Sequence, residues 1–469
     1  MELAIRTVML RARHLLGLSF SFLVACGSSE GDNSGAPVDP SQPVTPAPTT
    51  PDPSTTTSPP PSGPAPVSVI VMNQGDVPAA NVDVVFHDAS GAVIGRTKTD
   101  ATGKAVATGA APSMVTALMT APYLFNNTPQ RTRDALTWTN VRAGDVLRAP
   151  TEFYASAKAG SYNVALKPAP MNHWRYFVSV GDCMEGTDLS SVEVGVWGTC
   201  SNTAQGKARS VLVQSVDQAQ NVLGYSVAKN LPALGAQPIA VQTEAFQAPA
   251  SATFTPLDAA QVGSATLYVN EIVGGTTFQN PATATTFGEK PKALKYAPQA
   301  DGLQLLVWSN QPNASRQIAK RFAPGPDLQL SVATKLPAID VGATDATDAK
   351  RPKLGWTTQG SLAKSQGGTV TFDWFTPEGH HSWTIVVPIE ATSVQIPALP
   401  TELAAFEPEN PDKPLGGVVA FYDSSAIADA NAFRQEGART LMLDHGPMSM
   451  VLPQNGQTFE RVSAYKPKQ

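Results

Sequence analysis

Apolar and polar residues alternate along most of the chain after Pro66, with the period of two that a half-buried β-strand produces. Strand-like segments recur about every ten residues, separated by Gly, Asn, Asp or Pro, as in antiparallel β-sandwiches. Helical periodicity is scarce, and one short helix is expected within 428–437. In an early segment the alternation predicts two strand faces, Val82, Val84 and Phe86 on one and Asp83, Val85 and His87 on the other.

Short polar turns interrupt this pattern. Asp88–Gly91 and Asp100–Gly103 each place an aspartate at the start of a turn and a glycine where a positive φ is needed. The segment 215–226 echoes the segment 87–97, because both contain a strand, a polar turn, Val or Ile, and then Gly. Internal duplication and turn chemistry alone both explain this echo.

Three successive stretches carry the strand pattern, and they predict an all-β protein with two or three tandem antiparallel β-sandwich domains. The stretches cover residues 67–168, 169–339 and 340–469. The boundary between the second and the third lies in an acidic segment of small residues, "IDVGATDATDAKRP".

The first stretch resembles a known family of modules. Its residues "GDVPAANVDVVFHD" followed by "SGAVIGRTKTDATGKA" are similar to carboxypeptidase-regulatory-like, transthyretin-type or Ig-like modules of bacterial surface proteins. The resemblance covers 67–120 closely and extends loosely to residue 168. It implies a β-sandwich without catalytic residues, of a kind that serves as a spacer or a binding platform.

The N-terminal segment predicts export. Three arginines precede an apolar stretch, Leu15–Val24, which is too short to span a bilayer and has the length of a signal-peptide core. The residues Leu23–Gly27 resemble the lipobox of bacterial lipoproteins, in which an apolar residue and two small residues precede a cysteine. An ordinary secretory signal with a chance cysteine, or a cysteine buried in a folded domain, are the alternatives.

The lipobox resemblance implies that residues 1–25 are a removed signal peptide and that Cys26 carries diacylglycerol, with palmitate among its acyl chains. Two or three such chains anchor a protein durably, at about 0.8 kcal/mol per buried methylene. Gly27 and Ser28 lack the aspartate that retains lipoproteins at the inner membrane of enteric bacteria, so the outer membrane is favoured. Which face of that membrane displays the protein stays open.

Residues 26–66 predict a disordered linker between the acylated cysteine and the strand-rich part. The linker consists mostly of Pro, Thr, Ser, Gly and Asp and has almost no large apolar residue, so it cannot bury enough surface to fold. At about 3.1 Å per residue, a polyproline-like chain of this length extends on the order of 100 Å.

With Cys26 acylated, Cys183 and Cys200 remain as the other two of the three cysteines. In an oxidising compartment we predict a disulfide between them, worth about 3 kcal/mol in the chain-entropy model. A two-cysteine metal site is the alternative, but the nearest histidine, His173, is not at a ligand-like spacing.

The net charge of −5 and the absence of a basic cluster argue against binding to nucleic acid. Motifs of catalysis are also scarce. The match to Gly-x-Ser-x-Gly at Gly27–Gly31 falls in the linker, and no zinc-protease, phosphate-loop or dinucleotide-binding motif occurs.

Three clusters of polar residues are candidate sites. His380 and His381 are expected on a surface loop, and Asp444–His445 at a turn, although such pairs can serve in hydrolases. Asp182–Asp188 offers carboxylates for calcium, but its spacing matches no known loop, and a disulfide-closed surface loop is favoured. No catalytic residue, metal site or cofactor is therefore predicted.

The tryptophans are expected to pack between sheets, and a platform for stacking sugars is the alternative. Alternation puts Trp374 and Phe372 on one strand face, and Trp383, Ile385 and Val387 on another that should point inward. Tryptophans on or beside predicted strands are Trp174, Trp197, Trp308, Trp356, Trp374 and Trp383.

Together these observations predict a lipid-anchored cell-envelope protein with a structural or binding role and no enzymatic activity. Its expected partners are the membrane, through Cys26, and envelope polysaccharide or other surface proteins. The alternatives are a carbohydrate-binding or adhesion module and, less favoured, a hydrolase.

Overall fold

The structure is a computed structural model, and the residues it describes all belong to one structural unit, Ser62–Gln469. The described residues are 65–72, 78–125, 128–150, 158–181, 183–197, 209–235, 237–262, 264–279, 285–311, 313–376, 379–408, 416–440 and 452–466. Most of them form β-strands in several sheets, which confirms the predicted β class. Helix α2 (Ala430–Thr440) overlaps the segment where a helix was expected.

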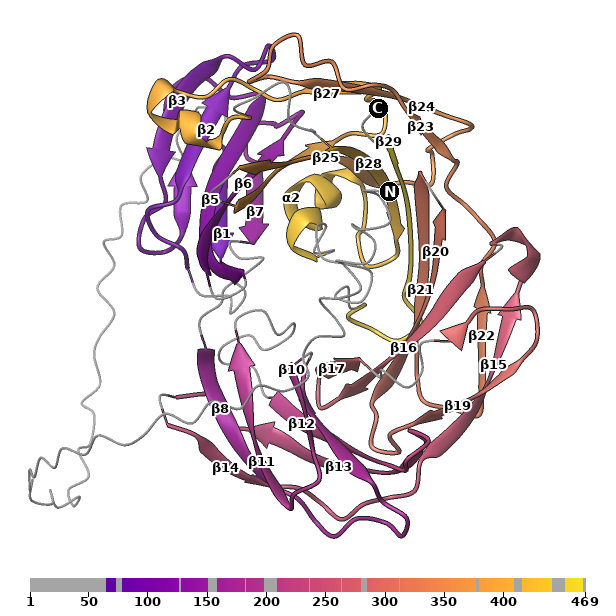
Figure 1. The fold of residues 1–469 in the computed structure, drawn as a ribbon. Helices are drawn as coiled ribbons and strands as arrows, with labels where there is room; N and C mark the ends of the chain where they lie inside the picture. Colours follow the sequence, from indigo (N-terminus) through magenta and orange to yellow (C-terminus); the bar gives the residue numbers. More distant parts are fainter. Residues whose placement is uncertain are drawn as a thin grey trace, which may run out of the picture. The chain divides into compact units, whose positions relative to one another are not determined.

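Thirteen strands form one large sheet (Figure 1). Its strands are antiparallel except for one parallel pair, β26 with β6. The order across the sheet is β17 (Thr276–Gln279), β16 (Ala265–Val273), β20 (Gly302–Gln311), β21 (Ala314–Phe322), β29 (Thr458–Lys466), β28 (Gly416–Ser424), β25 (Gly367–Thr376), β26 (Gly379–Val387), β6 (Thr128–Trp138), β5 (Met114–Phe125), β2 (Asp83–His87) and β3 (Val93–Lys98), and β18 (Thr285–Thr286) also pairs with β16.

This sheet draws strands from all three stretches of the sequence. The hairpin strands of the first stretch pair with the third stretch through β6 and β26, and the third pairs with the second through β29 and β21. Neighbouring strands in the sheet can therefore lie more than a hundred residues apart in sequence, as Trp138 and Val386 do.

Five smaller sheets accompany the large one. They are β4 (Lys104–Val106), β1 (Ser68–Met72) and β7 (Val146–Pro150); β10 (Cys183–Thr187), β9 (Arg175–Val180), β12 (Arg209–Val216) and β13 (Val222–Leu231); β11 (Ser191–Trp197), β8 (Lys158–Ala165) and β14 (Ile239–Gln242); β19 (Lys292–Tyr296), β15 (Ala250–Leu257) and β22 (Asp327–Ser331); and β23 (Ile339–Val341), β24 (Lys353–Thr358) and β27 (Ser393–Gln395). Two short 3-10 helices occur at Ala259–Gln261 and Thr401–Phe406.

Both faces of the middle of the large sheet are buried. On one face, Val84 and Phe86 share a hydrophobic cluster with β1, β7 and Phe433 of helix α2. On the other face, Val85 shares a cluster with β24. His87 is fully buried as well. Burial on both faces explains why strands here are apolar at nearly every position rather than at every second one.

Separate hydrophobic clusters hold the remaining sheets. One lies between β15, β19 and β22 and the strands β16, β20 and β21 of the large sheet. A second lies between the sheet of β9 and β12 and the sheet of β8 and β11. A third connects β12 and β13 to β16 and β17 through Tyr225, Val273 and Phe278.

The predicted turns form as expected, and the two similar segments 87–97 and 215–226 contain the same kind of turn. Gly91 has φ 79° and Gly103 has φ 74°, and each donates its N–H to the carbonyl of the aspartate three residues earlier. The segment 217–220 closes in the same way, with N–H of Gln220 bonded to the carbonyl of Asp217 at 2.9 Å. Gln220 adopts φ 63° where the other two turns have glycine.

Candidate functional site

His381 was expected on a surface loop, and the structure corrects this expectation. The turn between β25 and β26 is so short that His381 lies on β26 opposite Trp374, where it is 1% exposed. Its Nδ1 accepts the backbone N–H of Arg133 at 3.1 Å, and its Nε2 lies 2.8 Å from Oγ1 of Thr376. Both ring nitrogens are therefore engaged in structural hydrogen bonds. His380 also lies on β26, opposite Phe375, and nothing is described of its side chain.

The other two predicted clusters are described only in part or not at all. Asp444 and His445 lie outside the described residues, as does Asp182. In the rest of that segment, Glu185 is exposed on β10 and Asp188 is exposed after it. Within the described ranges, no group of three or more His, Cys, Asp or Glu is placed to hold a metal ion.

Two of the three cysteines, Cys26 and Cys200, also lie outside the described residues. Cys183 begins β10 and is half-buried beside the hydrophobic cluster of β8, β9, β11 and β12. The acylation of Cys26 and the disulfide between Cys183 and Cys200 therefore stay predictions.

The tryptophans divide into buried and partly exposed ones. Trp356, Trp374 and Trp383 are at most 4% exposed and belong to one core cluster, which confirms their predicted packing role. Phe372, Ile385 and Val387 are buried in the same cluster, so the two predicted strand faces do point inward. Trp174 is 42% exposed, with the Arg175 guanidinium 5.8 Å from its ring centroid, and Trp308 is half-buried.

A line of buried polar side chains crosses four adjacent strands of the large sheet, and we name it the closed row. It consists of His87 on β2, Thr116 on β5, Thr137 on β6 and Trp383 on β26. The hydroxyl oxygens of Thr116 and Thr137 are 2.8 Å apart, and His87 Nε2 is 2.9 Å from that of Thr116. Trp383 donates its indole N–H to Thr137 at 2.8 Å. Burial lowers the pKa of His87 to about 4, so the imidazole is neutral near pH 7.

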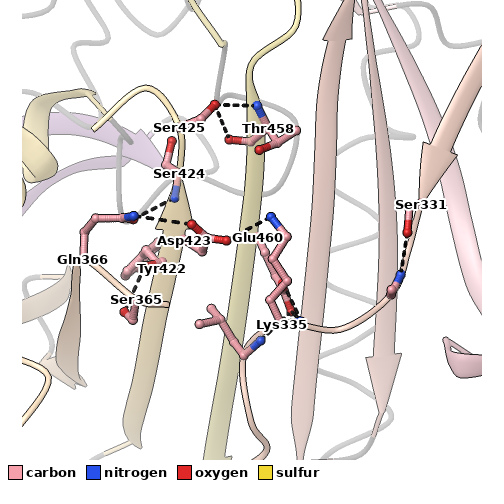
Figure 2. A network of polar contacts seen from close by, with 12 residues as sticks. Ser331, Lys335, Ser365, Gln366, Tyr422, Asp423, Ser424, Ser425, Thr458 and Glu460 are labelled. Atoms are coloured by element: carbon pink, nitrogen blue, oxygen red, sulfur yellow. Dashed lines mark hydrogen bonds and ion pairs between the residues drawn. The ribbon is translucent and has the colours of Figure 1, made fainter. Parts of the chain in front are cut away.

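A second polar network fixes the segment after β22 to strands β28 and β29 (Figure 2). Glu460 accepts the backbone N–H groups of Lys335 and Leu336, and it lies opposite Asp423 in the strand register. Lys335 places its ammonium group 3.1 Å from Asp423, and Arg316 lies 3.3 Å from Glu460.

Burial raises the pKa of Glu460 above its usual range, because desolvation disfavours its charge. The paired carboxylates resemble a catalytic pair, but each already has a cation and structural donors. This network therefore attaches the segment 331–336 to strands β28 and β29.

A different row of side chains crosses β20, β21 and β29, and we name it the open row. It consists of Trp308, Gln317 and Arg461, which stand directly opposite one another in the strand register. They share the sheet face of Ala319, because Ile318 packs into the cluster of the opposite face. Trp308 donates its indole N–H to Ser315 at 2.7 Å, and the Arg461 guanidinium lies 5.7 Å from the ring centroid of Tyr422.

Two of the three polar side chains of the open row lack a hydrogen-bonding partner among the described residues. Among the described residues, the side chains of Gln317 and Arg461 make no hydrogen bond or ion pair, although Gln317 is only 5% exposed and Nε of Arg461 is buried. An aromatic ring, a carboxamide and a guanidinium set side by side can bind a ligand with an apolar face, hydroxyl groups and a negative charge. We therefore take the open row as the candidate site.

The sequence pattern places Trp308 beside a predicted strand but gives no signal for Gln317 and Arg461. No local motif marks them, because Arg461 lies 144 positions after Gln317 and reaches it only by pairing of β21 with β29. A lone arginine beside a glutamate, as in Glu460–Arg461, instead suggests a local ion pair on an exposed segment.

No protein-family model and no curated protein matches the chain. Among solved structures, one that concerns host cell surface retention of a 1.5-MDa bacterial ice-binding adhesin is 15% identical, covers 54% of this chain and 82% of that chain, and has a TM-score of 0.13. A structure of E. coli alpha-2-macroglobulin is 8% identical, covers 84% of this chain and 34% of that chain, and also has a TM-score of 0.13. At such TM-scores, neither similarity informs the fold or the function of this chain.

Proposed function

We propose that the protein is an exported lipoprotein, held on the outer membrane by acyl chains on Cys26, that displays β-sandwich modules on a stalk. Its role is structural or binding rather than catalytic. The observation that carries the proposal is the order of features in the N-terminal segment: a signal-like apolar stretch, a lipobox-like cysteine, and then a linker of Pro, Thr and Ser up to residue 66.

In the described part of the chain, no helix is long and apolar enough to cross a membrane. The sandwich proposal is supported by the shared hydrophobic cluster that joins the sheet of β1 and β7 to strands β2, β5 and β6, within the segment that resembles surface modules.

The non-catalytic proposal is supported by how the described candidate groups are engaged. Both nitrogens of His381 are hydrogen-bonded within the fold, and Glu460 and Asp423 each contact a cation. A general base needs a nitrogen or carboxylate oxygen that can reach a substrate proton, and these groups are held by the fold instead.

Metabolic labelling with radioactive palmitate tests the anchor. We expect label in the wild-type protein and in a Cys183→Ala variant, and none in a Cys26→Ala variant. The Cys183→Ala variant controls for non-specific labelling of cysteine. Equal labelling of the Cys26→Ala variant would contradict the proposal.

A carbohydrate-binding role is the second candidate, and one observation favours it. Trp356, Trp374 and Trp383 are in the core and cannot form a stacking platform, but Trp308 lies half-buried beside the unpartnered amide of Gln317. An exposed part of an indole ring next to a free amide is an arrangement that suits a sugar.

A further inference from the structure

We propose that the open row binds an acidic sugar residue of a polysaccharide. The sugar ring contacts Trp308, the Gln317 amide bonds its hydroxyl groups, and the Arg461 guanidinium pairs with its carboxylate. The inference deepens the binding role proposed above and is independent of the lipid anchor at Cys26.

The strand register places the three side chains for such a ligand. Trp308 is opposite Gln317 across β20 and β21, and Gln317 is opposite Arg461 across β21 and β29. Adjacent strands are about 4.8 Å apart, so the row spans about 10 Å, roughly the length of one or two sugar rings. The three groups are therefore close enough to contact one ligand together.

The chemistry of Arg461 selects a negatively charged ligand. Its sequence neighbour Glu460 points to the opposite face of the sheet, where backbone N–H groups of Lys335 and Leu336 bind it. Arg461 thus keeps a guanidinium that no described carboxylate neutralises, and this group lies 5.7 Å from the ring centroid of Tyr422. A ligand carboxylate can accept two parallel hydrogen bonds from such a group.

The chemistry of Gln317 points to hydroxyl groups. The Gln317 carboxamide is 5% exposed and makes no side-chain hydrogen bond to the described residues, and its amide atoms are not fully shut off from solvent, so they remain open to a ligand. It offers two donors and an acceptor, which suit the hydroxyl groups of a sugar. Trp308 adds an apolar ring, and its N–H is already bonded to Ser315, so that its ring rather than its polar edge remains for a ligand.

The residues that border the row differ between its two sides. Ser315 and Ser463 flank Gln317 in one direction along the strands. In the other direction lies Ala319, between the bulky core residues Leu306 and Phe459. The ligand is therefore expected on the side of the two serines, where a longer residue would cover Gln317.

Titration of the full-length protein in detergent tests the inference, with binding followed by calorimetry and by tryptophan fluorescence. The probes are an oligosaccharide of galacturonic acid and the matching neutral oligosaccharide of galactose. We expect the wild type to bind the acidic probe at least about tenfold more tightly, the ratio that one hydrogen bond to a charged group supplies. The Trp308→Phe variant should lose the fluorescence change that binding causes.

Two variants of Arg461 separate charge from geometry. Arg461→Gln should abolish the preference for the acidic probe, and Arg461→Lys should keep part of it, because lysine retains the charge without the bidentate geometry. Arg142→Gln is the matched control, since Arg142 is exposed in the turn before β7 and lies outside the open row. Circular dichroism of each variant verifies that it is folded.

Three outcomes would overturn the inference: no binding of either probe, equal binding of both, or equal weakening by Arg461→Gln and Arg142→Gln. These outcomes are distinct from failure of the lipoprotein proposal. Palmitate on Cys26 without saccharide binding would reject only the site, and saccharide binding without palmitate would reject only the anchor.

Discussion

The closed row and the open row lie on the same sheet and each contains one tryptophan, but their polar groups are satisfied differently. In the closed row, hydrogen bonds of 2.8 and 2.9 Å connect four buried side chains. In the open row, an indole is bonded to the fold, while a carboxamide and a guanidinium beside it are not. All four side chains of the closed row are fully buried, whereas Trp308 and Arg461 of the open row are half-buried.

The difference shows how one sheet separates stability from binding. A buried chain of hydrogen-bonded side chains rigidifies the core and specifies the strand register, even though Nδ1 of His87 has no side-chain partner. Unpartnered groups contribute no such stability, and they are retained at a cost that a ligand can offset. Mutations in the closed row should therefore change the free energy of unfolding, and mutations in the open row should change binding.

Truncation of the largest member of the closed row should have the largest effect. Trp383→Ala should lower the free energy of unfolding by about 3–5 kcal/mol, because it opens a cavity in the core and removes a donor from Thr137. Urea unfolding followed by circular dichroism measures this loss. Trp174→Ala is the matched control and should cost much less, since Trp174 is 42% exposed. Equal losses in the two variants would contradict the assignment of Trp383 to the core.

Acid should weaken the closed row through His87. The pKa of His87 is about 4 in the folded protein and about 6.5 in the unfolded chain, so between these values only the unfolded chain binds the proton. The free energy of unfolding should thus fall by roughly 3 kcal/mol as the pH decreases from about 6.5 to about 4.

Urea unfolding at a series of pH values measures the contribution of His87. A His87→Gln variant should lose most of this slope, whatever its stability at pH 7. His173→Gln should lose less, since His173 is only partly buried. If the slope of the His87→Gln variant matched that of the wild type, His87 would not be the buried neutral group described above.

Removal of one hydroxyl from the closed row should cost less than truncation of Trp383. Thr137→Val leaves the indole N–H of Trp383 without its acceptor and removes a hydrogen-bond partner of Thr116. We expect the free energy of unfolding to fall by about 1–3 kcal/mol. Gln317→Leu in the open row is the comparison, and it should be neutral or stabilising because no described partner is lost. Thermal unfolding of both variants measures the contrast, and a larger cost for Gln317→Leu would reverse it.

Substitution of Arg461 should have the smallest effect on stability. Arg461→Gln should change the free energy of unfolding by no more than about 1 kcal/mol, since the guanidinium has no ion pair to lose and gives up only its contact with the Tyr422 ring. The same variant should lose the preference for an acidic saccharide. A large destabilisation would show that Arg461 serves the fold rather than a ligand.

The local parts of the fold were predictable from the sequence because their causes are local. Aspartate followed three residues later by glycine identifies the turns at Gly91 and Gly103, where a positive φ is required. At Gln220 the same turn forms without glycine, so the glycine rule alone would have missed it. Alternation likewise identified the inward face of Trp383, Ile385 and Val387.

His381 shows where such local inference ends. Two adjacent histidines next to a glycine look like a loop, but β26 begins at that glycine and pairs with β6, more than two hundred positions earlier in the chain. The buried environment of His381 comes from this pairing and not from its neighbours in sequence.

The sequence by itself determined the β class, the turns, the scarcity of catalytic motifs and the pattern that predicts a lipid anchor. These follow from side-chain periodicity, backbone preferences and composition, which act over a few residues. Only the tertiary structure decided which strands are neighbours, and hence that Trp308, Gln317 and Arg461 form one row while His87 and Trp383 belong to another. Register between distant strands depends on the packing of whole sheet faces, and that is a property of the folded chain.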